Sequence, residues 1–263
     1  MSGLSRWFVL LWKELLELQR SFKLIWVPLL FILLGIMQPV STYYLPVILE
    51  KAGNMPEGTV IEIPMPEGGQ VLADTLSQFG VMGLLVLVLV FMGTVSGERN
   101  SGAASLVLVK PISFSAYISA KWAAMQLLAW GSLLAGYLAA WYYTWLLIEV
   151  VPIASFLSSF AMFGLWLSFV MTLTILFSTV LRSAAGAAFA ALGLSLLLSV
   201  LSSLLPRYME WSPGAISGYA YALASGMTLS SADYVPSVGV ALAVIIAVLY
   251  GAAALLRRSP AID

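Results

Sequence analysis

Residues 97–121 read GERNSGAASLVLVKPISFSAYISAK, a segment with polar ends that separates two long apolar runs. The run before it covers residues 76–95 and the run after it covers residues 122–148, and neither contains a charged side chain. Each run has the roughly 20 apolar residues that a helix needs to cross the hydrocarbon core of a bilayer. The segment therefore predicts a connection between two membrane-spanning helices.

The composition of the whole chain agrees with a membrane protein. Hydrophobic residues make up 61% of the 263 positions and charged residues only 9%, which is too little polar surface for a soluble domain of this length. The formal net charge is zero, so no basic excess indicates a nucleic-acid partner. The chain has no cysteine and no histidine, which excludes disulfides, thiol catalysis, imidazole acid–base chemistry and His-ligated metal sites.

The apolar runs predict an all-α membrane protein with one domain over residues 1–263. We expect six spans, at residues 24–49, 76–95, 122–148, 154–181, 184–205 and 238–256.

The distribution of basic residues predicts the orientation. Ten of the twelve Lys and Arg fall on one side of the six expected spans, and only Lys51 and Arg207 fall on the other. Basic loops stay in the cytoplasm. We therefore expect a multi-pass protein of the cell membrane, with both termini and residues 97–121 on the cytoplasmic side.

Residues 206–236 contain an uncharged stretch long enough for a seventh span. This stretch is rich in Gly, Ser and Pro, and a seventh crossing would place Arg257 and Arg258 outside, against the charge pattern. We predict instead short re-entrant or interfacial helices, because irregular backbone at membrane depth must be shielded by protein.

The first residues predict an amphipathic helix over residues 4–23. Arg6, Lys13, Glu17 and Arg20 recur at helical spacing, while large apolar side chains fill the other side. Such a helix lies in the plane of the inner membrane surface. It serves either as a simple anchor or as an elbow that contacts a cytoplasmic partner, and the pattern does not choose between these two roles.

Catalytic motifs are missing from the sequence. No Gly-x-x-x-x-Gly-Lys-Ser/Thr phosphate-binding loop occurs, so any ATP that drives the protein must be bound by another subunit. The Asp, Glu, Lys and Arg residues fall outside the apolar runs, which argues against the buried carboxylate relay of an ion-coupled carrier. A lipid-modifying membrane enzyme would lack the usual acid–base pair.

Residues 97–121 themselves predict two short structural units. Residues 98–109 are expected to form a surface helix that Pro111 ends, with small side chains around Gly102 and apolar ones from Leu106. Ser113 is placed to N-cap the next helix, which continues into the third span. The unit is either a lever that moves two spans or an interfacial connector lying on lipid.

A stripe of small side chains marks the fifth span. Small residues at every fourth position let another helix approach closely, and here they are Ala187, Ala191, Ser195, Ser199 and Ser203. We expect this stripe to be a helix-packing surface.

The connection also resembles a known family. Glu98, Gly102, Leu106, Leu108, Pro111-Ile112-Ser113 and Lys121 are similar to the Glu-x-x-x-Gly-Thr-Leu…Pro-Ile-Ser…Lys signature of ABC-type-2 exporter permeases, the half-size membrane subunits that work with a separate ATPase. The layout of six spans behind an inner amphipathic helix is similar too. Ala103 departs from the common Thr, and Phe114 stands where a basic residue is frequent.

The polar side chains inside the spans, together with Met37, Phe163 and Trp166, favour an amphipathic or hydrophobic substrate over a small ion. The resemblance implies a permease subunit of an ATP-driven exporter that is not itself an enzyme. It implies two copies of a cytoplasmic ATPase that bind ATP and Mg, and a second permease subunit, expected as a homodimer with a heterodimer as the alternative. No cofactor or metal is expected in this chain, and no nucleic-acid partner; the lipid bilayer surrounds it. The coupling residues that the resemblance implies are Glu98, Arg99, Gly102, Leu106, Leu108, Lys110, Pro111 and Ser113.

Two alternatives from other classes are a membrane scaffold or immunity protein and a lipid-modifying membrane enzyme. The docking assignment predicts that Gly102→Trp uncouples ATP hydrolysis from transport, because a bulky side chain would lift the helix off the ATPase.

Overall fold

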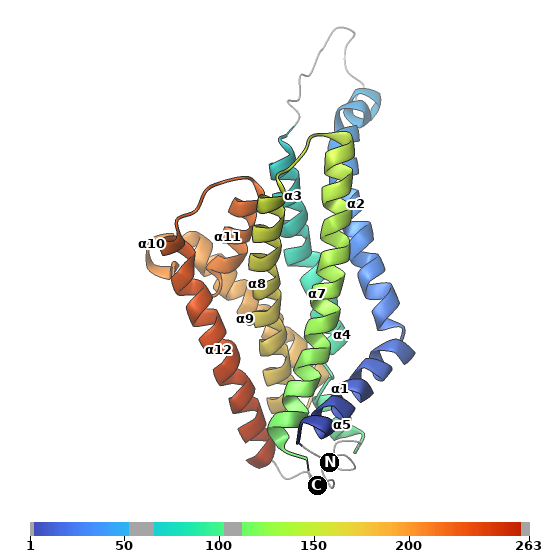
Figure 1. The fold of residues 1–263 in the computed structure, drawn as a ribbon, viewed down its shortest axis with the longest axis vertical. Coiled ribbons are helices and arrows are strands. Elements are labelled where there is room, and N and C mark those ends of the chain that lie inside the picture. Colours follow the sequence, from blue (N-terminus) through green and yellow to red (C-terminus); the bar gives the residue numbers. More distant parts are fainter. Residues whose placement is uncertain (1–2, 53–65, 103–111, 259–263) are drawn as a thin grey trace.

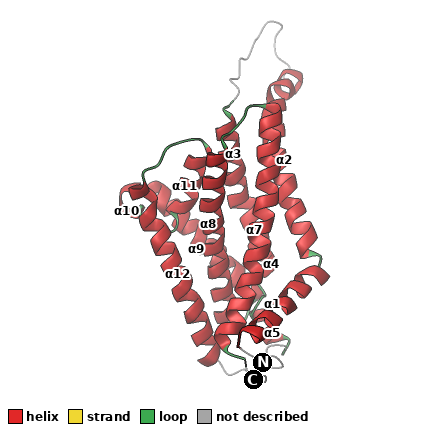
Figure 2. Ribbon diagram, viewed as in Figure 1, coloured by secondary structure: helices red, strands yellow, loops and turns green. Residues whose placement is uncertain are grey.

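The computed structural model describes residues 3–52, 66–102 and 112–258 of the chain. These residues form helices joined by short turns, and no strand occurs among them (Figure 2). In chain order the elements are α1 (Gly3–Arg20), α2 (Lys23–Ala52), α3 (Gly68–Gln78), the π-helical turn η1 (Phe79–Gly83), α4 (Leu84–Phe91), α5 (Ser96–Asn100), α7 (Phe114–Leu147), α8 (Ile153–Val180), α9 (Ala184–Leu204), α10 (Pro206–Met209), α11 (Ala215–Ala224) and α12 (Ser231–Arg258).

Six stretches of the described chain are helical, long and apolar enough to cross a membrane, which confirms the predicted all-α, six-span fold class. They are Lys23–Val47, Gly68–Asn100, Phe114–Leu147, Ile153–Val180, Ala184–Leu204 and Ser231–Arg257. Helix α8 lies at the centre of the bundle (Figure 1) and is the most buried of the six. It packs against α7, α9, α11 and α12.

The second span starts earlier than the apolar run predicted. Helix α3 begins at Gly68, before residue 76, because Val71, Leu72 and Thr75 are buried against protein. A carboxylate also favours this start: the amide of Gly68 donates to Glu149 Oε1 at 2.6 Å, and a negative charge stabilises a helix N-terminus. Hydropathy alone does not detect a helical turn that neighbouring helices cover.

A sharp corner separates α1 from α2. Helix α1 ends at Arg20, short of the predicted residue 23, and Phe22 adopts a left-handed φ of 57°. The Ser21 hydroxyl donates to the carbonyl of Glu17 at 2.7 Å and stabilises the last turn of α1. Because of this corner α1 lies obliquely across the start of α7, at the end of the bundle where α12 ends (Figure 1).

Two glycines bring α2 and α7 into backbone contact. A β-carbon on Gly35 would lie 2.1 Å from the carbonyl oxygen of Gly136, and one on Gly136 would lie 2.5 Å from the carbonyl oxygen of Phe31. Such distances are far below van der Waals contact, so neither position accepts a larger residue without moving a helix.

Residues 206–236 contain the short helices α10 and α11 and the first turn of α12. Helix α11 has ten residues, roughly 15 Å at 1.5 Å per residue, which is too short to cross a bilayer. It packs against α3, α8 and α9, and Ile216, Ala220 and Ala224 are fully buried in this contact. Helix α12 begins at Ser231, before the predicted residue 238.

The stripe on α9 is buried along only part of its length. Ala187, Ala191 and Ser195 are buried, whereas Ser199 is half-buried and Ser203 is exposed. A spacing of four residues drifts around a helix that turns every 3.6 residues, and near the end of α9 Ser202 is the buried serine.

Candidate coupling site

The site begins where the second span ends, at a turn followed by the short helix α5. The buried amides of Val95 and Ser96 both donate to Ser178 Oγ, at 3.1 and 3.2 Å. The Ser178 hydroxyl in turn donates to the carbonyl of Met92 at 2.8 Å. Buried backbone groups need partners, so one serine near the end of α8 supports the break between α4 and α5.

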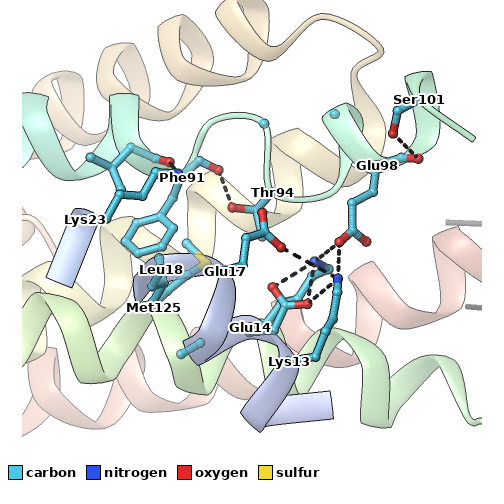
Figure 3. A pocket seen from close by; sticks show the side chains of 15 residues that line it. Lys13, Glu14, Glu17, Leu18, Lys23, Phe91, Thr94, Glu98, Ser101 and Met125 are labelled. Carbon is cyan, nitrogen blue, oxygen red and sulfur yellow. Dashed lines mark hydrogen bonds and ion pairs between the residues drawn. The ribbon is translucent and has the colours of Figure 1, made fainter. Parts of the chain in front are cut away.

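A set of charged groups, buried except for the partly exposed Lys13, lies between α1, α5 and α7. We call Lys13, Glu14, Glu98, Tyr117 and Lys121 the inner charge cluster. Lys121 Nζ contacts both oxygens of Glu14, at 2.9 and 3.0 Å, and Oε1 of Glu98 at 2.9 Å. Lys13 Nζ and the Tyr117 hydroxyl also donate to the carboxylate of Glu98, and Lys13 Nζ contacts Glu14 at 3.0 Å. Figure 3 shows Lys13 and Glu14 of α1 facing Glu98.

The burial of these charges is unusual for a surface helix. The side chain of Lys121 is 2% exposed and those of Glu14 and Glu98 are 11% and 13% exposed. A buried charge costs several kcal/mol unless it is paired and hydrogen-bonded. Here two ammonium groups compensate two carboxylates, so the cluster is neutral as long as all four charges are present.

The carboxylates of the cluster raise the pKa of Lys13. Partial burial by itself lowers the pKa of this amine, but its hydrogen bond to Glu98 and the nearby charge of Glu14 outweigh burial, so the pKa of Lys13 lies above its ordinary value. Lys13 is therefore charged throughout the physiological pH range.

Three carboxylates of this region lie close enough together to raise the question of a metal ion. Oxygens of Glu14, Glu17 and Glu98 lie within 4.8 Å of one another. The ammonium groups of Lys13 and Lys121 already neutralise Glu14 and Glu98 at hydrogen-bonding distance. The arrangement is therefore an ion-pair cluster and not a set of free cation ligands.

A cavity of about 480 Å³ is lined in part by the cluster (Figure 3). Lys23, at the start of α2, reaches into it and donates to the carbonyl of Val90 at 3.1 Å. This bond satisfies a carbonyl at the end of α4 that the helix itself leaves free. It also links the first span to the end of the second.

Helix α5 is bound on its other side to the corner between α8 and α9. Arg99 Nη1 donates to the carbonyl of Thr179 at 2.8 Å, and Asn100 Nδ2 donates to the carbonyl of Arg182 at 2.9 Å. With the inner charge cluster, these bonds join a five-residue helix to α1, α7 and α8. A displacement of α5 therefore acts on several spans at once.

The structure corrects the predicted surface helix over residues 98–109. Helix α5 ends at Asn100, and Gly102 adopts a left-handed φ of 74° that no α-helix continues through. Leu106, Leu108, Lys110 and Pro111 lie outside the described residues. Ser113 is the N-cap of α7, as predicted, and accepts a hydrogen bond from the amide of Ala116 at 3.2 Å.

Two residues of the predicted coupling set face the protein interior. Glu98 and Arg99 direct their polar groups to partners within the chain, whereas Gly97 and Gly102 are exposed with open space beside them. Contact of Glu98 or Arg99 with an ATPase stays a prediction, and it would involve their backbone or the exposed surface around them.

Neither Glu14 nor Tyr117 was predicted as a partner of Glu98. Lys121 was expected only as part of the cytoplasmic segment 97–121 and of the family signature. The available signal was spacing: Leu10, Glu14 and Leu18 recur every fourth residue and are all buried, which places Glu14 within an apolar stripe. Tyr117 and Lys121 have the same spacing on α7.

The fold and the site define an all-α, multi-pass membrane protein whose described buried charges gather around a helix that joins several spans. The sequence comparison specifies the family: the chain belongs to the ABC-2 family transporter proteins, whose profile matches residues 8–210. It is also 38% identical over 207 residues to YxlG of Bacillus subtilis (strain 168), described as an uncharacterized transmembrane protein; the match covers 79% of this chain and 80% of the relative.

Family membership has three consequences for the molecule. A protein of this family is a transport membrane subunit and not a catalytic one. It works with an ABC ATPase subunit. The chain is therefore a transmembrane transporter subunit, and the six apolar helices are its membrane-spanning part.

Proposed function

We propose that this chain is the permease subunit of an ATP-driven exporter in the cell membrane. A separate cytoplasmic ATPase binds ATP and Mg in two copies, and two permease chains, expected as a homodimer, enclose the pathway. Both termini lie on the cytoplasmic side. Family membership supports the partnership with an ATPase, and the position of ten of the twelve basic residues supports the orientation.

The observation that carries the proposed coupling is the set of bonds around α5. Glu98 accepts from Lys13 of α1 and from Tyr117 and Lys121 of α7, while Arg99 donates to the end of α8. In the proposed mechanism the ATPase pushes on the exposed surface around Gly97 and Gly102. The bonds of α5 transmit this movement to α1 and to the third and fourth spans.

The cargo that we propose is amphipathic or hydrophobic. Most buried polar side chains of the described spans are hydroxyls, such as those of Ser132, Ser159 and Thr174, and the buried ionised groups gather instead around α5. A small ion would need charged or closely spaced carbonyl ligands along its path. Hydroxyl and aromatic groups suit a larger molecule with few charges.

Co-purification with an ATPase tests the proposed function. The partner to co-express is the product of a neighbouring reading frame that contains a Gly-x-x-x-x-Gly-Lys-Ser/Thr motif. We expect a complex in mild detergent, and ATP hydrolysis that changes when the permease chain is present. If no ATPase is recovered and the isolated ATPase has the same rate with and without this chain, the coupling proposal is wrong and a scaffold role becomes the better explanation.

A further inference from the structure

The break between α4 and α5 is not imposed by the backbone of the residues that form it. Only residues 92–95 separate the two helices, and they include no proline. Met92 and Val95 both have right-handed helical backbone angles, and none of these four residues has a left-handed φ. A backbone of this kind can continue an α-helix. The break therefore depends on groups outside the local chain.

One serine replaces two hydrogen bonds of a continuous helix. In an unbroken helix the amide of Val95 would donate to the carbonyl of Phe91. In the same way the amide of Ser96 would donate to the carbonyl of Met92. Instead both amides donate to Ser178 Oγ, and the Ser178 hydroxyl donates to the carbonyl of Met92. These three bonds use the proton and both lone pairs of the hydroxyl.

The neighbouring carbonyls of α4 also have side-chain partners. The carbonyl of Phe91 accepts from the amide of Thr94 at 3.0 Å and from Thr94 Oγ1 at 2.7 Å, and the carbonyl of Val90 accepts from Lys23. Polar side chains thus satisfy the end of α4 in its broken form. Ser178 differs from Thr94 and Lys23 because it also accepts from amides on the far side of the break.

Burial makes the hydroxyl of Ser178 decisive. Ser178, Val95 and Ser96 have almost no exposed surface, so water does not replace a lost partner. A buried amide without an acceptor is costly. If the hydroxyl is removed, the two amides can regain acceptors by turning toward the carbonyls of Phe91 and Met92, as in a continuous helix. Residues 92–96 therefore have two arrangements, and the hydroxyl selects the broken one.

We propose that Ser178 is a positioning residue for coupling: its hydroxyl keeps the joint between α4 and α5 broken and thereby sets the direction of α5. Without the hydroxyl, residues 92–96 join the two helices. Glu98 and Arg99 then leave the positions from which they contact Lys121 and the end of α8. The inference rests on the proposed function, because α5 is the helix on which the ATPase is proposed to act.

The direction of α5 can be measured without an ATPase. The chain has no native cysteine, so nitroxide labels can be attached at Ser101→Cys, directly after α5, and at Arg257→Cys, in the last turn of α12. Both positions are exposed, and α5 and the end of α12 lie at the same end of the bundle (Figure 1). Double electron–electron resonance in nanodiscs gives the distance between the labels.

The expected change follows from the length of the segment. From Val95 to Ser101 a helix rises roughly 9 Å. A change in its direction by about 20°, the size of a sharp kink, moves its end by about 3 Å. We expect Ser178→Ala to shift the mean label distance by about that amount or more.

Two further variants separate the hydroxyl from general effects of substitution. Ser178→Thr retains a hydroxyl and should keep the wild-type label distance. Thr75→Val is the matched control, because the buried Thr75 hydroxyl donates to the carbonyl of Val71 in its own helix, at 2.8 Å. Its removal should leave the label distance unchanged.

The second measurement is transport per ATP hydrolysed, in vesicles that contain the ATPase partner. We expect Ser178→Ala to lower this ratio by roughly fivefold, the effect of one hydrogen bond, and Ser178→Thr and Thr75→Val to keep the wild-type ratio. A purely structural defect would instead reduce the amount of folded complex and leave the ratio of the remaining complex unchanged.

The results that would overturn the proposal differ between the two measurements. A wild-type label distance in Ser178→Ala, or an equal shift in Ser178→Thr or Thr75→Val, would show that the hydroxyl does not set the direction of α5. A shifted distance with unchanged transport per ATP would remove Ser178 from coupling and leave the partnership with the ATPase intact. If no ATPase is recovered, the proposed function fails, and the label distances still decide whether Ser178 sets the direction of α5.

Discussion

Lys121 is a lysine on a membrane-spanning helix with almost no exposed surface, and it holds two carboxylates together. Replacing it with methionine would keep the volume and leave Glu14 and Glu98 with only the partly exposed Lys13 as their shared cation, so one carboxylate would stay uncompensated. Breaking a buried ion pair in this way costs about 3–5 kcal/mol. We expect Lys121→Met to lower the unfolding midpoint strongly in a detergent-based thermal unfolding assay.

The matched control for Lys121→Met removes one carboxylate as well. In the double variant Lys121→Met with Glu14→Leu, the remaining Lys13 and Glu98 still form a pair, so no uncompensated charge is left buried. The double variant should therefore recover most of the lost stability. A single variant as stable as the wild type would show that the cluster does not hold α1 in place.

The conformation of Gly102 affects how the predicted docking of an ATPase at this surface can be tested. Its φ of 74° is a conformation that side chains with a β-carbon adopt at a cost of about 1–2 kcal/mol. Gly102→Trp therefore changes the local backbone as well as the surface. Gly97 has helical backbone and open space beside it, so Gly97→Trp adds the same bulk without that strain.

We expect Gly97→Trp to allow ATP hydrolysis by the partner but to reduce transport, because the indole occupies the surface that the ATPase would push. The measurement compares ATPase rate and transport in reconstituted vesicles, with Gly97→Ala as the small control. Transport by Gly97→Trp at the wild-type rate per ATP hydrolysed would contradict docking at this surface.

At the scale of elements, the contact between α2 and α7 depends on two glycines. A methyl group on Gly136 would lie 2.5 Å from the backbone of Phe31, so Gly136→Ala forces the helices apart and should destabilise the protein by about 1–3 kcal/mol. On the same helix Gly131 has open space beside it, and Gly131→Ala should be neutral or stabilise by up to about 1 kcal/mol. Thermal unfolding of the two variants gives the comparison, and equal midpoints would rule out the close approach.

Some elements of the fold could be predicted from the sequence and others could not. The lengths of the apolar runs predicted the approximate positions of the six spans, and Ser113 predicted the cap of α7. The early start of α3 could not be predicted from apolar run length, because Val71 and Leu72 are covered by other helices and not by lipid. The surface helix was predicted to run without a break from residue 98 to residue 109, whereas α5 ends at Asn100. The sequence could not predict this end, because a glycine with a left-handed φ, such as Gly102, looks the same in a sequence as a helical glycine.

For the whole molecule, the inner charge cluster is the feature that the sequence alone does not locate. Charge counting assigns Lys13, Glu98 and Lys121 to one side of the membrane, but it treats them as solvated surface charges. Their burial depends on α1 folding back at Phe22 and crossing α7. That placement is a property of the tertiary structure, so the cluster could be suspected from the spacing of Leu10, Glu14 and Leu18 but not located.

The orientation of the whole molecule has a direct test, since the chain has no native cysteine. Glu67 and Gly97 are exposed at opposite ends of the second span. Single variants Glu67→Cys and Gly97→Cys should react with a membrane-impermeant maleimide from opposite sides, Glu67→Cys from outside in intact cells. Labelling of Gly97→Cys in intact cells, without permeabilisation, would reverse the assigned orientation.

The ion pair between Glu14 and Lys121 also constrains how the protein is made. Its partners are 107 residues apart in the chain, so at roughly 5–20 residues per second the ribosome needs about 5–20 s between them. During that interval the carboxylate of Glu14 has no lysine from the third span to neutralise it. The first helix can therefore reach its final position only after the third span has entered the membrane, which makes its docking a late step of biosynthesis.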